Sequence, residues 1–310
     1  MTWPTKHFHD RSFRMQRLLL KLIFLSIAIA GQAFAVFPTS QPYPGVTYQL
    51  IEIKNPPNRV HVVTVDLQSV SVRIVVSQGG ADRPYTDGYE TTLLGPLAIA
   101  DRDGLDIVIN GDFFEAKRFK DAKGTTRPFA PGDPANVRGA AESNGITWAK
   151  APTTRPALIV THDGHARIQR LRGPPPSDAE QVISGSSIML QGGKLRPMAT
   201  TLETALNPRT AVGITGDGNT LILLVDDGRW KDHSVGMSTT DLAKVMLNLG
   251  CTSALNLDGG GSTEMALRDP ATGKLVVVNH PSEGHERPVA NVLGIRITGT
   301  KRVAVPTTRP

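Results

Sequence analysis

The chain has 310 residues, a formal net charge of +6, 39% hydrophobic residues and one cysteine, Cys251. This length can bury a large core, in one elaborate domain or two small ones. The single cysteine excludes an internal disulfide framework. The absence of a Lys/Arg-rich run beyond the N-terminal segment gives nucleic-acid binding no support.

The N-terminal segment is typical of a signal peptide. Basic residues at positions 11, 14, 17 and 21 precede an apolar run over residues 22–30, and Ala33-Phe34-Ala35 forms a small-x-small cleavage site. The run is shorter than the roughly 20 residues that a membrane span needs. We therefore expect cleavage before Val36, an exported, periplasmic or extracellular protein, and no stable membrane span afterwards; an uncleaved anchor is the alternative. Without residues 1–35, 29 basic residues face 27 acidic ones.

The first half of the remaining chain reads mainly as strands. Val-rich segments at residues 61–67 and 71–77 predict a hairpin, and a helix is expected over residues 91–101. A short strand over residues 106–110 follows. Residues 115–156 lack clear periodicity, which predicts a long functional or mobile loop.

The second half repeats this pattern with one clear helix. Strands are expected at residues 157–161 and 183–190, hairpins at 209–215 with 220–225 and at 264–267 with 274–279, and a last strand at 291–297. A helix is predicted from Ser238 or Thr239 to Gly250, before a strand over residues 253–257. Because the order does not alternate βαβα, we predict an α+β fold with a mixed, strand-rich sheet core and few helices.

The most informative segment follows that strand. Asp258 precedes three consecutive glycines, Gly259 to Gly261, and the hydroxyls of Ser262 and Thr263. Glycines let the backbone turn sharply and bring its N–H groups close to a ligand. The segment predicts an anion cradle beside a carboxylate, with a tight turn between strands as the alternative. It is not a P-loop, because Gly261 occupies the position of the required lysine.

Seven short motifs occur in order around this loop. They are Asn110-Gly111-Asp112-Phe113-Phe114, Ile183-Ser184-Gly185-Ser186, Asn207-Pro208-Arg209-Thr210-Ala211-Val212-Gly213, Asp227-Gly228-Arg229, Ser234-Val235-Gly236-Met237-Ser238, the segment 257–263, and Glu286-Arg287-Pro288-Val289-Ala290-Asn291. Together they resemble the phosphodiester glycosidase family over residues 106–297. The chain departs from the family pattern at Asp226, where an apolar residue is more usual, and in an insertion-like segment at residues 117–138, which suggests a substrate rim of its own.

The resemblance implies a hydrolase that cleaves the glycosyl–phosphate bond of a sugar 1-phosphodiester, releasing a reducing sugar and a phosphomonoester. A carboxylate can stabilise a cationic sugar carbon or activate the attacking water, and a guanidinium group can bind the phosphate. The predicted catalytic residues are Asp258, Asp227 and Glu286. The predicted substrate- and phosphate-binding residues are Asn110, Asp112, Ser184, Ser186, Arg209, Arg229, Gly259, Gly260, Ser262 and Thr263.

Structural alternatives accompany several of these residues. Arg209 suits a surface or salt-bridge position, Asp227-Gly228 is a common turn pair, and Glu286 with Arg287 suits a surface ion pair. No cofactor and no metal are expected, with calcium left open. The expected partner is a carbohydrate phosphodiester in a glycan, glycolipid or envelope polymer. The alternative functions are an exported glycosidase on uncharged glycans and a non-catalytic carbohydrate- or phosphate-binding envelope protein.

The expected organisation is a signal peptide at residues 1–35, a strand-rich part at 36–105, a catalytic domain at 106–300 and a tail at 301–310.

Overall fold

Apolar strands buried on both faces build the largest sheet of the fold. A computed structural model describes residues 34–36, 39–80, 88–150, 154–197 and 200–299, and the predicted signal peptide lies almost wholly outside these ranges. Among these residues the nine-stranded sheet has, in order, β1 (Phe34–Val36), β3 (Val46–Lys54), β4 (Pro57–Asp66), β18 (Thr220–Asp226), β17 (Arg209–Thr215), β19 (Cys251–Asn256), β15 (Ser187–Gln191) and β16 (Lys194–Leu195), with β2 (Ser40–Tyr43) beside β3.

Three smaller sheets complete the strand pairing of the described ranges. One contains β21 (Leu275–Val277), β20 (Met265–Arg268), β7 (Ile107–Asn110), β22 (Asn291–Ile297) and β5 (Val72–Gln78). Another contains β11 (Ile146–Lys150), β10 (Ala140–Ser143), β14 (Ala179–Ser184), β12 (Pro156–Thr161) and β13 (Ala166–Arg170). The last contains β6 (Thr91–Thr92), β9 (Pro134–Val137) and β8 (Phe114–Ala116).

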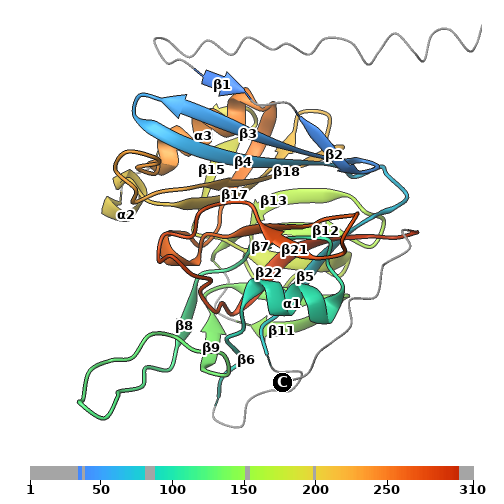
Figure 1. The fold of residues 1–310 in the computed structure, drawn as a ribbon. Coiled ribbons are helices and arrows are strands. Elements are labelled where there is room, and N and C mark those ends of the chain that lie inside the picture. Colours follow the sequence, from blue (N-terminus) through green and yellow to red (C-terminus); the bar gives the residue numbers. More distant parts are fainter. Residues whose placement is uncertain (1–33, 37–38, 81–87, 151–153, 198–199, 300–310) are drawn as a thin grey trace, which may run out of the picture. The chain divides into compact units, whose positions relative to one another are not determined.

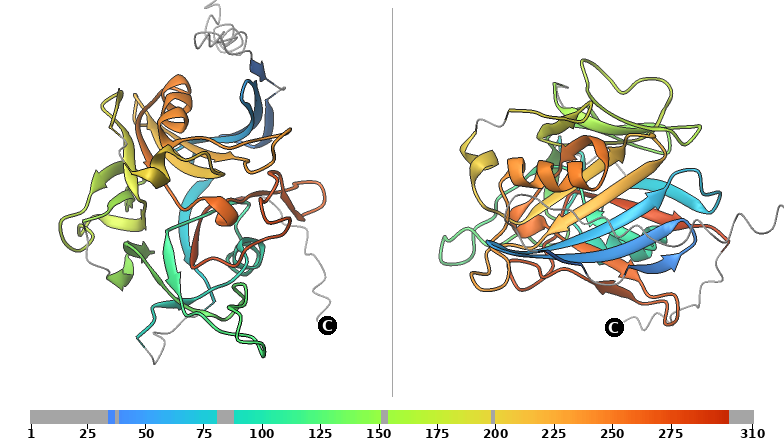
Figure 2. Two further views of the ribbon diagram at one scale, coloured as in Figure 1. Left: turned by 90° about the vertical axis from the view of Figure 1, so that its left-hand side faces the viewer. Right: turned by 90° about the horizontal axis from the view of Figure 1, so that it is seen from above.

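Side-chain alternation divides the core into layers. Leu221, Leu223 and Val225 of β18 point into the core shared with Ile107 and Leu293 of the β7–β22 sheet. The residues between them, such as Ile222 and Leu224, pack against α3 on the other face. Figures 1 and 2 show α3 against the large sheet and α1 against the β7–β22 sheet.

The helices are few and have clear end signals. α1 (Pro96–Asp103) begins with Pro96, whose missing N–H costs nothing in the first turn. α2 spans Thr201–Thr204 and α3 spans Thr239–Asn248. The Ser238 hydroxyl caps α3 by accepting a hydrogen bond from Asp241 N at 3.1 Å.

The strand-rich α+β prediction is confirmed, as are both later hairpins, the α3 helix and the last strand. The described strand pairs are antiparallel, where a mixed sheet was predicted. The predicted hairpin of residues 61–67 with 71–77 is wrong, because β4 pairs with β3 and β18 whereas β5 pairs with β22 in another sheet. Alternation identified the strands but not their partners.

Two other predictions are corrected for local reasons. The predicted loop at residues 115–156 contains β9, β10 and β11, which are too short for periodicity to reveal. The single strand predicted at residues 183–190 is two strands in different sheets. The chain changes sheets at Gly185, where a Cβ would collide with Asn256 O.

The strands before residue 105 belong to the same sheets as those after it. β4 forms seven residue pairs with β18, from Asp66–Thr220 to Val60–Asp226, and β5 pairs with β22. The described residues form one compact unit. The predicted boundary at residue 105 marks where the family motifs begin in the sequence, and the domain organisation stays a prediction.

Candidate active site

The glycine loop leaves the middle of the large sheet. Asn256 at the end of β19 pairs with Ala211 on one side and with Ser187 on the other. Beyond it, Leu257 N donates to Thr210 O at 2.9 Å and Asp258 N donates to Gly111 O at 3.0 Å. The loop is thus held between the large sheet and the end of β7, before the 3₁₀ turn η1 (Gly260–Ser262).

The side chain of Asn110 anchors the glycine loop through hydrogen bonds. It donates to Asp258 O at 2.7 Å and accepts from Thr210 Oγ1 at 2.7 Å and from Glu264 N at 3.2 Å. The side chain is fully buried. These contacts favour a positioning role, and direct substrate binding by Asn110 stays a prediction.

Asp258 has the electrostatic setting of an acid–base group. Burial raises the pKa of its carboxyl to about 6, against the hydrogen bonds from Ser262 and Gly259 N and the charges of Arg287 and Arg138, which lower it. Gly259 N donates to Asp258 Oδ1 at 3.0 Å. A carboxyl with this pKa changes its charge near neutral pH, which suits proton transfer.

Asp112 is a second buried carboxyl near Asp258. Its Oδ1 accepts from Ser184 N at 2.8 Å and its Oδ2 accepts from Asn291 Nδ2 at 2.6 Å. Burial raises the pKa of Asp112 well above its usual value, and the negative charge of Asp258 raises it further. Ser184 Oγ in turn donates to Ala140 O at 2.8 Å. Both side chains are therefore committed to contacts within the protein.

The glycines make room for two guanidinium groups. Gly260 has φ +63°, and a Cβ there would lie 2.9 Å from Arg229 Nη2. A Cβ at Gly261 would collide with Arg287 and Glu283. Any larger side chain in the loop would displace these groups.

The backbone of the loop is a less open anion cradle than the sequence predicts. Gly259 N is bound to the Asp258 carboxylate, and Gly260 N donates to Pro208 O at 2.9 Å. Ser262 N and Thr263 N make longer bonds within the turn, at 3.3 and 3.2 Å. Among the described residues, Gly261 N is the loop amide for which no acceptor is found.

Arg229 and Arg287 flank the loop. Arg229 is exposed, has φ +67°, and donates from Nη2 to Asn207 Oδ1 at 3.1 Å. Arg287 donates from Nη1 to Ser262 Oγ at 3.5 Å and from Nε to Glu283 Oε2 at 3.0 Å. The ion-pair partner of Arg287 is thus Glu283 rather than the Glu286 of the sequence alternative.

Arg209 lies inside the protein. Its Nε donates to Met237 O at 2.8 Å, and its Nη2 donates to Leu202 O at 2.9 Å and Ala205 O at 2.7 Å. The side chain is 7% exposed. These bonds tie the end of α2 to β17, so the geometry favours a structural role, in the interior and not at the surface or in a salt bridge as the sequence alternative had it. Phosphate binding by Arg209 stays a prediction.

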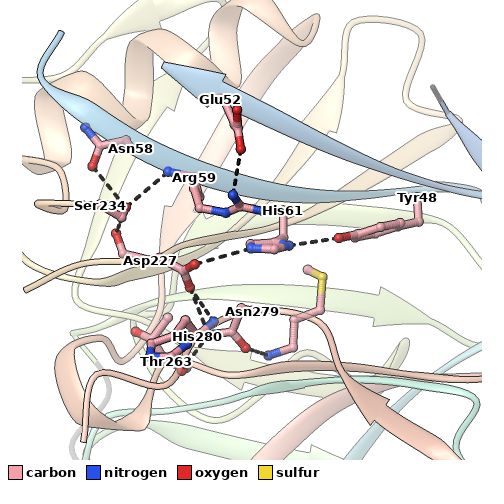
Figure 3. Close-up of polar contacts among 11 residues, drawn as sticks. Tyr48, Glu52, Asn58, Arg59, His61, Asp227, Ser234, Thr263, Asn279 and His280 are labelled. Carbon is pink, nitrogen blue, oxygen red and sulfur yellow. Dashed lines mark hydrogen bonds and ion pairs between the residues drawn. The ribbon is translucent and has the colours of Figure 1, made fainter. Parts of the chain in front are cut away.

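Asp227 is the centre of a buried polar network (Figure 3). Its Oδ1 accepts from His280 N at 2.8 Å and from Asn279 Nδ2 at 3.3 Å. Its Oδ2 lies 3.5 Å from His61 Nε2, and Tyr48 Oη lies 2.9 Å from His61 Nδ1. The side chain of Asp227 is 1% exposed, so its predicted catalytic role stays a prediction.

Glu286 caps a helix, and its neighbour Glu264 was missed from the sequence. Glu286 Oε2 accepts from Leu97 N at 2.9 Å in the first turn of α1. Burial and, to a smaller extent, the adjacent carboxylate of Glu286 together raise the pKa of Glu264 to about 9. Glu264 directly follows the glycine loop, but neither its residue type nor its spacing distinguishes it from a strand residue.

The hydroxyls differ in their surroundings. Ser186 Oγ accepts from Asn256 Nδ2 at 2.8 Å. Ser186 thus lies between β14 and β15, next to the end of β19 from which the glycine loop begins. The hydroxyl of the buried Thr263 has no hydrogen-bond partner within the described part of the chain. The site as a whole combines one acid of near-neutral pKa with two flanking guanidinium groups.

The chain belongs to the phosphodiester glycosidase family. The sequence model of that family matches residues 103–296, which is more than half of the chain. Within these bounds lie the glycine loop, Asp112, Asp227 and both flanking arginines. The resemblance predicted from the ordered motifs is therefore confirmed.

One curated relative is matched over a short segment. It is the uncharacterized SPbeta prophage-derived protein YomE of Bacillus subtilis strain 168, 39% identical over 89 residues. This segment is 29% of the present chain and 13% of YomE. The chain thus spans a small part of that relative's length.

The fold is shared with solved structures, among them the following three. A candidate exported protein of Burkholderia pseudomallei K96243 has a TM-score of 0.61 at 16% identity, covering 88% of this chain and 98% of its own. A hypothetical protein of Synechocystis has a TM-score of 0.58 at 16% identity, covering 84% and 63%. The catalytic domain of zebrafish N-acetylglucosamine-1-phosphodiester alpha-N-acetylglucosaminidase, auto-inhibited by its pro-peptide, has a TM-score of 0.55 at 20% identity, covering 86% and 83%.

Proposed function

We propose that this protein hydrolyses the glycosyl–phosphate bond of a sugar 1-phosphodiester and releases a reducing sugar and a phosphomonoester. The observation that carries the proposal is the setting of Asp258, a carboxyl with a pKa of about 6 beside a loop flanked by Arg229 and Arg287. Membership of the phosphodiester glycosidase family supports it, as does the shared fold with an enzyme named for a sugar 1-phosphodiester.

In the proposed reaction, the bond between the anomeric carbon and the bridging oxygen breaks. The electron pair leaves with that oxygen on the phosphomonoester, while the oxygen of water forms the new bond to carbon. Ionised Asp258 takes the proton of the attacking water, or it stabilises the cationic sugar carbon while that proton passes to solvent. Arg229 and Arg287 neutralise the phosphate through charge-assisted hydrogen bonds, and Gly261 N adds a donor.

The other predicted site residues support this centre in the proposal. Asn110 holds the loop that carries Asp258. Asp112 and Ser184 join the segment after β7 to the end of β14, and Ser186 holds the neighbouring strand end. Asp227 and Glu286 position the segment that carries Arg287, the first from the large sheet and the second from α1. Ser262 orients the Asp258 carboxyl.

We also propose that the protein works outside the cytoplasm. The basic and apolar pattern before Val36 supports export. Each described helix is too short or too polar to cross a bilayer. Fractionation of native cells followed by mass spectrometry tests the proposal, with a terminus at Val36 expected in the exported fraction. An intact Met1 on exported material would identify an uncleaved anchor, and protein confined to the cytoplasm would contradict the proposal.

The test of the activity is incubation of the purified chain with a panel of sugar 1-phosphodiesters, measuring released reducing sugar. We expect turnover that falls at least 100-fold in Asp258→Asn. Arg229→Gln should raise KM, whereas Lys231→Gln, an exposed neighbour of equal charge, should not. Tight binding without turnover would instead identify a binding protein, and equal activity on uncharged glycosides would identify an ordinary glycosidase.

A further inference from the structure

A basic hairpin stands beside the candidate site. Residues 114–138, which comprise β8, β9 and the connection between them, carry six basic and three acidic side chains. Figure 1 shows the green connection between β8 and β9 extending away from the sheets. It is ordered by its own contacts, among them Arg127 N donating to Phe119 O at 3.0 Å and Asp133 accepting from Ala130 N at 2.8 Å.

Aromatic rings hold the cations of this hairpin in place. The Arg118 guanidinium carbon lies 4.1 Å from the centroid of the Phe129 ring, and that of Arg287 lies 6.0 Å from the same ring. Phe114 packs on Phe129 with centroids 5.5 Å apart. An arginine on a ring face keeps its in-plane N–H groups available to an anion.

The hairpin is connected to the proposed catalytic acid through one continuous path. Phe129 contacts Arg287, Arg287 donates to Ser262 Oγ at 3.5 Å, and Ser262 is hydrogen-bonded to Asp258. A group bound at Arg118 would therefore lie next to the phosphate that Arg287 binds, on the side away from Asp258.

The cations of this region differ in their partners. Arg127 is paired with Asp133, Arg138 with Glu115 and Arg287 with Glu283. Within the described ranges, no carboxylate lies within ion-pair distance of the exposed Arg118. Arg118 is thus a fixed positive charge that no acidic side chain of the described residues neutralises.

We propose that the rim formed by Arg118, Phe129 and Arg287 binds a second anionic group of the substrate. This inference rests on the function proposed above and narrows its substrate class to sugar 1-phosphodiesters whose aglycone carries a further phosphate. Two kinds of aglycone would supply this second phosphate, namely the next unit of a polymer of glycosyl phosphate repeats and a small phosphorylated alcohol.

Three substrates distinguish the sources. They are a sugar 1-phosphate methyl ester, the same sugar phosphate joined to glycerol that bears a phosphomonoester, and an oligomer of glycosyl phosphate repeats. Arg118→Gln should lower kcat/KM about tenfold for substrates with the second phosphate, the effect of one charge-assisted hydrogen bond. The methyl ester should change less than twofold. Lys123→Gln, which removes an exposed charge from the same hairpin, should leave all three unchanged.

A binding measurement separates the rim from the reaction. We expect a glycerol phosphate trimer to bind the purified chain at least tenfold more tightly than glycerol 1-phosphate, with the difference lost in Arg118→Gln. Hydrolysis with no effect of Arg118→Gln would overturn the rim and leave the proposed function standing. Trimer binding through Arg118 with no hydrolysis of any sugar phosphodiester would overturn the proposed function and leave the rim standing as an anion-binding site. A variant that loses only binding to phosphatidylglycerol vesicles would identify a membrane surface and overturn the rim.

Discussion

His61 Nε2 lies 3.5 Å from Asp227 Oδ2, and the two side chains are 2% and 1% exposed. His61 belongs to β4 and Asp227 directly follows β18, so the pair joins two neighbouring interior strands of the large sheet where β18 ends. The same carboxylate accepts from His280 N, which belongs to the segment leading to Arg287 (Figure 3). Asp227 therefore connects the large sheet with the segment that flanks the glycine loop.

The first prediction concerns this carboxylate. Asp227→Asn leaves the backbone N–H of His280 and the buried side-chain amide of Asn279 without a charged acceptor, so the free energy of unfolding should fall by about 2 kcal/mol or more. Activity should fall with it, because the Arg287 segment loses its anchor. Thermal melts and kinetics measure both, with Asp232→Asn, an exposed carboxylate nearby, as the control. Lost turnover with unchanged stability would instead make Asp227 a catalytic group.

The pH dependence of activity follows from Asp258. Its pKa is about 6, and the proposed reaction uses the ionised form. The carboxyl is protonated below this pH, so kcat/KM should rise as pH increases through about 6 and then level off. Asp258→Asn should remove this limb while the chain stays folded. A profile that falls through pH 6 would make Asp258 the general acid instead.

Arg209 distinguishes a structural from a phosphate-binding role. Arg209→Lys cannot reproduce the fork that donates to Met237 O, Leu202 O and Ala205 O. We expect the free energy of unfolding to fall by about 1–3 kcal/mol, with turnover per folded molecule retained. If Arg209 binds phosphate, as the sequence analysis predicts, activity falls and the melting temperature holds. Calorimetry together with kinetics on phosphodiester substrates decides between the two.

Asp226 should make the stability depend on pH. Both of its carboxylate oxygens are buried without a hydrogen-bond partner in the described part of the chain. Burial raises its pKa well above the usual value, and the neighbouring Asp227 raises it further. The folded state thus holds this proton more tightly than the unfolded state, so the contribution of Asp226 is present at low pH and is lost as pH rises through the folded pKa. Asp226→Leu should therefore raise the melting temperature at pH 8 more than at pH 4, and an equal shift at both would contradict the account.

The sequence predicted those parts of the structure that local patterns determine. The turn signals around Gly218 and Gly273 gave both hairpins, and Ser238 gave the start of α3. Strand partners were missed where the chain changes sheets, at residues 67–71 and at Gly185, because a period of two does not specify the neighbour.

For the candidate site, the sequence identified the loop but not the use of each side chain. Arg209 and Arg229 are alike as residues, yet one is 7% exposed among carbonyl groups and the other is exposed beside Gly260. Glu264 and Arg287 acquire their settings from residues far away in the chain, Glu264 from Glu286 and Arg287 from Phe129. Such long-range contacts have no local signature.

Hydrolysis in oxygen-18 water tests the central claim, which is that the enzyme attacks the sugar carbon and not phosphorus. The Asp258 carboxyl and the arginines that hold the phosphate predict breakage of the carbon–oxygen bond. Mass spectrometry of the products should find the label at the anomeric position of the released sugar and none in the phosphomonoester. Label in the phosphomonoester would show attack at phosphorus and contradict the glycosidase account.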